Sequence, residues 1–246
     1  MSSIGTLLPR LQAQRPLVHC VTNPVTMNFV ADALNAVSAR PIMANSPAEI
    51  DTIAGAASAV LVNMGVPQSA QIYVQAAKAA QKWVFDPVGA GGTKLRIDIA
   101  QQLLPLRPGI IRGNAGEILA LGGQAGVVEG VDSLATPEEA AGVAKLLAEK
   151  YRTVVAMTGA TDYVVSPDRI VRLTGGDGLM ASITGTGCVA GALCTAFLAV
   201  SDDPFDAAVA ALHLMSGAAD HAAKSAKGPG SFKVALLDAF YSASSQ

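Results

Sequence analysis

The sequence predicts a single α/β domain over residues 1–246, with a mostly parallel central sheet covered by helices on both faces. Three observations predict it. Short apolar runs alternate with segments of helical spacing along the whole chain, which is the order that builds a parallel sheet. The runs are rich in Val, Ile and Leu without polar alternation, as in strands buried on both sides. No linker-like, low-complexity or repeated segment divides the 246 residues.

The first half of the chain contains four expected strands and two expected helices. Each strand is an apolar run that ends at a polar or glycine-containing loop, and each helix repeats its apolar residues every three or four positions. The strands are expected at residues 17–21, 41–44, 59–64 and 83–85, and the helices at 27–37 and 68–82.

The second half begins with a strand at 110–112, a helix from Ala115 and a glycine-rich loop at 122–130. Residues 137–150 predict an amphipathic helix with acidic residues in its first turn and Lys150 at its end, which suits the helix dipole. A sixth strand at 153–157 precedes a hairpin of residues 163–166 and 170–173. Helices are expected after Cys188, at 204–224 and at 232–241.

The composition limits the possible partners and the cellular compartment. Hydrophobic residues make up 51% of the chain and charged residues 15%, so a large core, a subunit interface or both are expected. A net charge of −2 argues against nucleic acid or an acidic membrane as a partner. Three cysteines without a CxxC pair argue against zinc and disulfides and favour the cytoplasm. Neither a signal peptide nor a membrane-spanning run is evident.

Ligands of open parallel sheets bind beyond the carboxyl ends of the strands. In this chain the loops at those ends concentrate the polar and glycine residues, which predicts a binding site there. The loops begin at Thr22, Asn63, Asp86, Arg112, Thr158 and Thr184.

Residues 184–188, Thr-Gly-Thr-Gly-Cys, predict a sharp turn that opens a helix. Glycine lets the backbone approach a ligand closely, and the free N–H groups of a helix start suit a phosphate. Cys188 falls in the first turn, where the same field is expected to lower the thiol pKa. The alternative is an ordinary glycine-rich turn capped by Thr186.

Four further side chains fit phosphate and metal chemistry. Asp86 ends a buried strand and could hold Mg²⁺ directly or through water, or it could cap a turn. Arg112 is a fork-shaped donor for phosphate oxygens and Glu117 is a second metal candidate, although the two could simply form a local ion pair. Thr158 could bond a phosphate or close its turn.

The loop at residues 22–28 offers two amides and the flexible thioether of Met27, which suits a small and mostly apolar ligand. The alternative is a core residue, which is the more common role of a methionine on a helix face. The three histidines are scattered and form no triad, and the GxSxG, HExxH, Walker A and Rossmann patterns are absent.

Five runs in order, at residues 19–28, 86–96, 111–118, 157–164 and 184–188, resemble the hydroxyethylthiazole kinase family over nearly the whole chain. The resemblance implies a ribokinase-like fold and ATP-dependent phosphorylation of the hydroxyethylthiazole hydroxyl with Mg²⁺, in a cytoplasmic homotrimer of thiamine biosynthesis and salvage. It implies that the functional residues divide as follows: Met27 and Gly185 contact the thiazole, Arg112 and Thr158 contact ATP, Asp86 and Glu117 serve the metal, and Cys188 lies beside the hydroxyl.

Two other functions are weighed against this one. A ribokinase-like kinase of hydroxymethylpyrimidine or another vitamin alcohol would share the phosphate-side residues, and the loop at residues 22–27 favours thiazole. A non-catalytic binding protein of the same fold would be expected to lose Asp86, Glu117 or the Gly-Thr-Gly turn, all of which are present.

Overall fold

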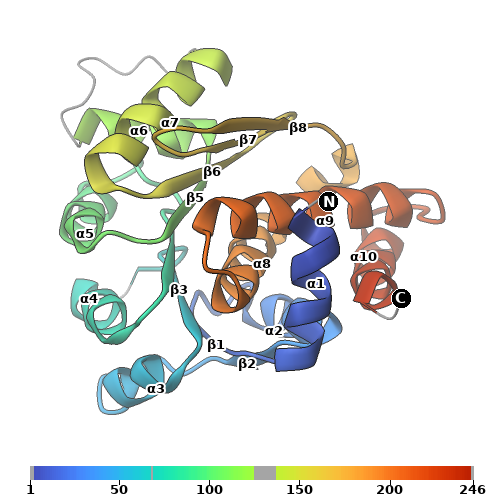
Figure 1. Ribbon diagram of the computed structural model, residues 1–246, viewed down its shortest axis with the longest axis horizontal. Helices are drawn as coiled ribbons and strands as arrows, with labels where there is room; N and C mark the ends of the chain where they lie inside the picture. Colours follow the sequence, from blue (N-terminus) through green and yellow to red (C-terminus); the bar gives the residue numbers. More distant parts are fainter. Residues whose placement is uncertain (1–2, 68, 125–136, 245–246) are drawn as a thin grey trace.

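Eight strands form one sheet through the centre of the computed structural model, which describes residues 3–67, 69–124 and 137–244 (Figure 1). The order across the sheet is β2-β1-β3-β4-β5-β6-β7-β8. Strands β1 to β6 are parallel, and β7 and β8 add an antiparallel hairpin at one edge. The strands are β1 Leu17–Val21, β2 Arg40–Ile42, β3 Ala59–Asn63, β4 Trp83–Asp86, β5 Ile110–Asn114, β6 Val154–Thr158, β7 Asp162–Val165 and β8 Ile170–Leu173.

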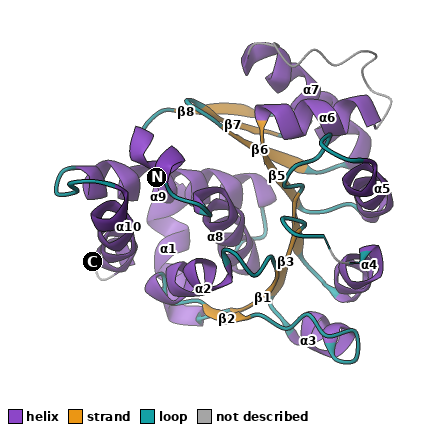
Figure 2. Ribbon diagram, turned by 180° about the vertical axis from the view of Figure 1, so that it is seen from behind, coloured by secondary structure: helices purple, strands orange, loops and turns teal. Residues whose placement is uncertain are grey.

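Helices cover both faces of the sheet (Figure 2). One face carries α1 Ser3–Gln14, α2 Met27–Ala36, α8 Thr186–Val200, α9 Pro204–Ala223 and α10 Pro229–Ser244. The other carries α3 Ile50–Ala56, α4 Ala70–Ala79, α5 Lys94–Leu103, α6 Ala115–Gln124 and α7 Pro137–Tyr151. Two short 3₁₀ helices are Leu104–Leu106 and Gly178–Ser182. The predicted fold class is confirmed.

The predicted strands and the hairpin are confirmed with boundaries shifted by one or two residues. Helices α1, α3 and α5 are present in addition to the predicted elements. The predicted glycine-rich loop is wrong at Gly122 and Gly123, because α6 continues to Gln124, and residues 125–130 lie outside the described part of the chain. The buried side chains of Ile118 and Leu121 hold this end of α6 against the core.

Helix α8 is the central helix of its face and lies over β3, β4 and β5. Nearly every residue from Cys188 to Val200 is buried, and none of them is charged. Gly191 faces the end of β4, where a Cβ would stand 3.0 Å from Asp86 Oδ2. The absence of a side chain there lets the helix lie close to the carboxylate, so α8 is both a core helix and one wall of the site.

His19 of β1 is fully buried, and its Nε2–H donates to the carbonyl oxygen of Ala44 at 2.6 Å. Its Nδ1 has no hydrogen-bond partner among the described residues. Burial lowers the pKa of His19 below its usual 6.5, against the opposing effects of the Ala44 carbonyl and the Glu49 charge. The folded protein therefore holds this ring neutral.

Acid conditions should destabilise the fold through His19. The unfolded chain binds a proton near pH 6.5 and the folded chain resists it, so the stability is fully present above that pH and falls as the pH drops below it. We expect the thermal midpoint of the wild type to decrease relative to that of His19→Gln as the pH drops from 7 to 5, since the raised pKa of Asp86 acts in the opposite direction but equally in both proteins. Parallel pH profiles in the two proteins would show that another group is responsible.

Candidate functional site

The carboxyl ends of the parallel strands bring the predicted polar side chains together at one edge of the sheet. The strand register places Asn63 beside Asp86 and Asn114 beside Thr158. Arg112 lies two residues before the end of β5, with its guanidinium buried among these groups. The structure thus brings these residues together, and their role as a binding site stays a prediction.

The turn before α8 begins the helix at this same edge. Gly185 is the N-cap residue with a φ of +100°, and a Cβ there would stand 2.8 Å from Thr26 Cγ2. No side chain caps the helix. The expectation that Thr186 could cap the turn is wrong, because its hydroxyl donates to the carbonyl oxygen of Met180 at 3.2 Å. The first N–H groups of α8 therefore have no partner within the helix and suit an anion.

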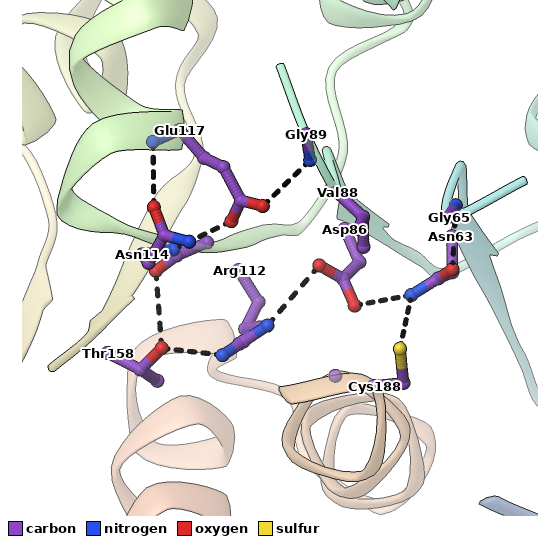
Figure 3. Close-up of polar contacts among 12 residues, drawn as sticks. Asn63, Gly65, Asp86, Val88, Gly89, Arg112, Asn114, Glu117, Thr158 and Cys188 are labelled. Carbon is purple, nitrogen blue, oxygen red and sulfur yellow. Dashed lines mark hydrogen bonds and ion pairs between the residues drawn. The ribbon is translucent and has the colours of Figure 1, made fainter. Parts of the chain in front are cut away.

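Side chains from β3, β4, β5, β6 and α8 form one continuous polar chain (Figure 3). Arg112 Nη2 donates to Thr158 Oγ1 at 2.5 Å, and Arg112 Nη1 lies 3.4 Å from Asp86 Oδ1. Asn63 Nδ2 donates to Asp86 Oδ2 at 2.7 Å and to Cys188 Sγ at 3.3 Å. The chain links the thiol to the guanidinium through one amide and one carboxylate.

Asn63 is a functional candidate for which the sequence offers only its position at a strand end. Its Oδ1 accepts hydrogen bonds from Gly65 N at 3.0 Å and from Asn23 Nδ2 at 3.1 Å. These two donors fix the orientation of the amide, so that its Nδ2 must face the Asp86 carboxylate and the Cys188 sulfur. The side-chain amide holds both groups in place.

Burial dominates the electrostatics of the carboxylate and the guanidinium. It raises the pKa of Asp86 to about 7, with Glu117 adding to the rise and Arg112 opposing it. Burial also disfavours the charged form of Arg112, yet the Asp86 and Glu117 charges raise its pKa overall. The site therefore holds the fixed positive charge of Arg112 beside the Asp86 carboxyl group, and this charge offsets only part of the cost of burying the carboxylate.

The expected lowering of the Cys188 pKa is wrong. Burial raises the pKa of this thiol, and the Asp86 charge adds to the rise. Hydrogen bonds from Asn63 and Asn23 act in the opposite direction but do not reverse it. The start of α8 does place Cys188 in the first helical turn, but removal of the sulfur from water outweighs the favourable field.

Glu117 is held by backbone N–H groups. Its Oε1 accepts from Gly89 N and its Oε2 from Asn114 N, each at 2.8 Å. The alternative of a local Arg112–Glu117 ion pair is not borne out, since the guanidinium lies against Asp86 and Thr158. Glu117 thus ties the loop after β4 to the start of α6 and keeps its carboxylate at the site.

Two cavities meet at the start of α8. The Thr158 cavity is about 690 Å³ and is lined by residues including Thr158, Asp162, the glycine-rich segment 175–178 and Thr186. The Cys188 cavity is about 380 Å³ and is lined by residues including Asn23, Thr26, Glu117, Gly185 and Cys188. Their linings share three residues: Arg112, Asn114 and Gly187. A group bound at this junction is reachable from both sides.

Six of the seven predicted site residues lie at the junction or around it, and Met27 does not join them. Met27 is the first residue of α2 and lines neither cavity. Within the described residues, no three His, Cys, Asp or Glu side chains converge as a ready-made metal site. A divalent cation here would therefore need ligands from water or from a bound phosphate. No helix in the described ranges is long and apolar enough to cross a membrane.

Comparison with known proteins gives one consistent family. Residues 8–246 match the hydroxyethylthiazole kinase family. The hydroxyethylthiazole kinase of Clavibacter sepedonicus is 46% identical over 241 residues, covering 95% of this chain and 87% of that protein. The enzyme of the same name from Pyrococcus furiosus is 42% identical over 248 residues, covering 98% of this chain and 93% of that one.

A solved structure of the same family superposes closely on this chain. The hydroxyethylthiazole kinase protein from Pyrococcus horikoshii OT3 superposes with a TM-score of 0.90 at 39% identity, covering 97% of this chain and 92% of that chain. The pyridoxal kinase of Staphylococcus aureus in complex with pyridoxal has a TM-score of 0.66 at 18% identity, covering 83% of this chain and 87% of that one. The second likeness concerns the fold alone.

Proposed function

Because the chain belongs to the hydroxyethylthiazole kinase family, and is thus an ATP-dependent kinase of the hydroxyethylthiazole hydroxyl in thiamine biosynthesis and salvage, we propose where the transfer takes place. ATP occupies the Thr158 cavity and the alcohol occupies the Cys188 cavity. The observation that carries the proposal is that the two cavities share Arg112, Asn114 and Gly187. A donor and an acceptor in separate pockets would meet only there, at the start of α8.

The donor side positions the phosphates and stabilises their charge. Thr158 and Arg112 contact the nucleotide, and the free N–H groups of Gly187 and Cys188 face the migrating phosphoryl group. The fixed charge of Arg112 offsets the negative charge of the phosphate oxygens. Phosphoryl transfer needs little covalent chemistry from the protein, so positioning and charge stabilisation of this kind are its main contribution.

The acceptor side directs the alcohol toward the γ-phosphorus. Gly185 has no side chain and leaves room for the thiazole, while Asn23 and Asn63 hold the sulfur of Cys188 beside the hydroxyl. The thiolate form of Cys188 takes the hydroxyl proton and becomes the thiol; this form is the less populated one at neutral pH, because burial raises the thiol pKa. Contact of Met27 with the thiazole stays a prediction. Hydroxymethylpyrimidine is the rival acceptor, and an ADP-release assay with each alcohol separates the two and also tests for a non-catalytic binder.

Cys188→Ser should lower kcat by about 100-fold, near the lower end for the loss of a proton acceptor. The KM for ATP should stay unchanged, because Cys188 does not line the Thr158 cavity. Since burial raises the thiol pKa, the wild-type kcat should climb as the pH rises above neutral, and the climb should disappear in the variant. Turnover within a few-fold of wild type, with the same pH profile, would leave Cys188 a packing residue.

Magnesium would neutralise phosphate oxygens during the transfer. Glu117 lines the Cys188 cavity and would hold the ion through water, whereas Asp86 is fully enclosed and would act on it through its charge. Burial, with the Glu117 charge adding to it, raises the pKa of Asp86, so a cation nearby would favour the charged form of this carboxyl group. The two carboxyl groups therefore fit an ion that takes its remaining ligands from phosphate and water.

The double variant Asp86→Asn/Glu117→Gln should need more Mg²⁺ for half-maximal activity, because both charges that attract the ion are gone. Titration of ADP release against Mg²⁺ measures the shift. An unaltered titration curve would remove both residues from the metal's surroundings.

We propose further that the enzyme works as a homotrimer in the cytoplasm. Val25 and Val66 are 68% and 43% exposed at the rim of the Cys188 cavity, which supports contact with another subunit there. The three cysteines are buried and free, which fits a reducing compartment. Light scattering on the purified protein tests the trimer.

A further inference from the structure

Arg96 lies in the first turn of α5, outside both cavities, yet its guanidinium reaches back to the loops that form the Cys188 cavity. Nη1 donates to the carbonyl oxygen of Met64 at 2.5 Å and also to that of Val88, and Nη2 donates to Gly65 O at 2.8 Å. Met64 and Gly65 follow β3, whereas Val88 follows β4. One side chain therefore joins two loops that are separate in the sequence.

The partners of Arg96 are all neutral. None of the ion pairs among the described residues includes Arg96. The planar fork of a guanidinium can serve several carbonyl oxygens at once, which a lysine ammonium on its flexible stem cannot reproduce. The bonding pattern thus depends on the shape of the arginine and not on charge pairing.

The two loops that Arg96 joins are walls of the Cys188 cavity, through Gly65, Val66 and Val88. Their other sides are held by site residues, because Asn63 Oδ1 accepts from Gly65 N and Glu117 Oε1 accepts from Gly89 N. Each loop is thus fixed by its N–H groups from within the site and by its carbonyl groups from Arg96.

Gly89 makes the close approach of the guanidinium possible. Its φ is +70°, and a Cβ there would stand 3.2 Å from Arg96 Nε and 3.3 Å from Cδ and Cζ. The arginine therefore packs flat against the loop after β4 as well as hydrogen bonding to it. Movement of Arg96 would release the loops after β3 and β4 together.

We propose that Arg96 is a positioning residue that sets the width of the acceptor cavity, and with it the affinity and selectivity for the alcohol. The inference rests on the proposed placement of hydroxyethylthiazole in the Cys188 cavity. Arg96 touches neither ligand and acts through the carbonyl groups of Met64, Gly65 and Val88. Its loss should affect the acceptor and leave the nucleotide alone, since none of these three residues lines the Thr158 cavity.

The test compares Arg96→Met, which keeps the aliphatic packing, and Arg96→Lys, which keeps the charge, with Lys94→Met. Lys94 is an exposed cation on the same helix turn, and its one ion-pair partner among the described residues is Asp98 at the surface, so it controls for the lost charge. Calorimetry should show hydroxyethylthiazole binding weakened about 10- to 100-fold in both Arg96 variants, as expected for misplaced binding walls, with ADP binding within twofold of wild type. The kcat/KM ratio of thiazole to pyrimidine alcohol should also fall.

Alkylation of Cys188 by iodoacetamide gives a readout that needs no ligand. Cys188 lines the cavity, whereas Cys20 and Cys194 are enclosed in the core, so the labelling reports the opening of the cavity walls. The rate should increase in both Arg96 variants and stay at the wild-type value in Lys94→Met.

Unchanged labelling, or equal loss of thiazole and ADP binding, would overturn the role of Arg96. If the wild-type protein binds no hydroxyethylthiazole but the Arg96 variants are labelled faster, the proposed acceptor is overturned. The positioning role of Arg96 then stands. Arg96→Lys keeps the test open if Arg96→Met does not fold.

Discussion

Arg112→Ala is expected to lower kcat by about 10²–10³-fold, the usual cost of removing one preorganised group that stabilises developing charge. The guanidinium lies at the junction of the two cavities and donates to Thr158, so its loss removes the fixed positive charge and frees the Thr158 hydroxyl. The KM for ATP should rise as well. Steady-state ADP release over a range of ATP concentrations measures both parameters.

The same substitution should destabilise the fold. It leaves Asp86 buried without its cationic partner, and breaking a buried pair in this way typically costs about 3–5 kcal/mol. Arg112→Lys is the matched control. It retains the charge, so it should recover most of the thermal midpoint, but an ammonium cannot serve Asp86 and Thr158 together and kcat should stay low. Wild-type kcat and KM in Arg112→Ala would exclude Arg112 from the reaction.

Gly187→Ala is expected to lower kcat by about 10²-fold through Arg112. The new Cβ would stand 2.7 Å from Arg112 Nη1 and 3.0 Å from Nη2, so the guanidinium must move away from the start of α8. A misplacement of a reacting or catalytic group by about 1 Å typically lowers the rate by about 10²-fold. Gly187 does not adopt a positive φ, so the substitution acts through the contact and not through backbone strain.

Gly217→Ala is the matched control for this prediction. Gly217 lies on the exposed side of α9, lines neither cavity, and a Cβ there would meet no atom within 4 Å. The substitution should leave kcat within twofold of wild type, measured in the same ADP-release assay. Equal loss in the two variants would mean that an added methyl group lowers activity wherever it stands, and the specific link between residue 187 and Arg112 would fail.

Much of the fold is predictable because the strands are continuous apolar runs between loops, a pattern that a buried parallel sheet requires. The helices that were not predictable, α1, α3 and α5, lack an equally clear pattern in the sequence. Helix α1 contains Pro9 in its interior, where a proline predicts a break, and α5 buries only Ile99, Ala100 and Leu103 while leaving Leu95 exposed. Their helical form depends on packing against neighbours that the sequence does not identify.

The site is predictable to the level of which loops meet, because parallel strands place their carboxyl ends at one edge. The pKa of Cys188 is not, since burial and the approach of Asp86 arise only from tertiary packing. The orientation of the Asn63 amide likewise depends on Asn23, forty positions away along the chain. Residue type and spacing indicate the chemistry, whereas its tuning depends on contacts between distant segments.

The small overlap between the two cavities has a consequence for protein engineering. Since Arg112, Asn114 and Gly187 are the only described residues that face both cavities, a mutant library confined to Val25, Val66 and Val88 would vary the rim of the Cys188 cavity without altering any described residue that lines the Thr158 cavity. Variants that phosphorylate new alcohols could then be selected while the residues of the proposed ATP cavity stay unchanged. The same division would let the enzyme evolve activity toward a different vitamin precursor in small steps, because each intermediate protein would still use ATP.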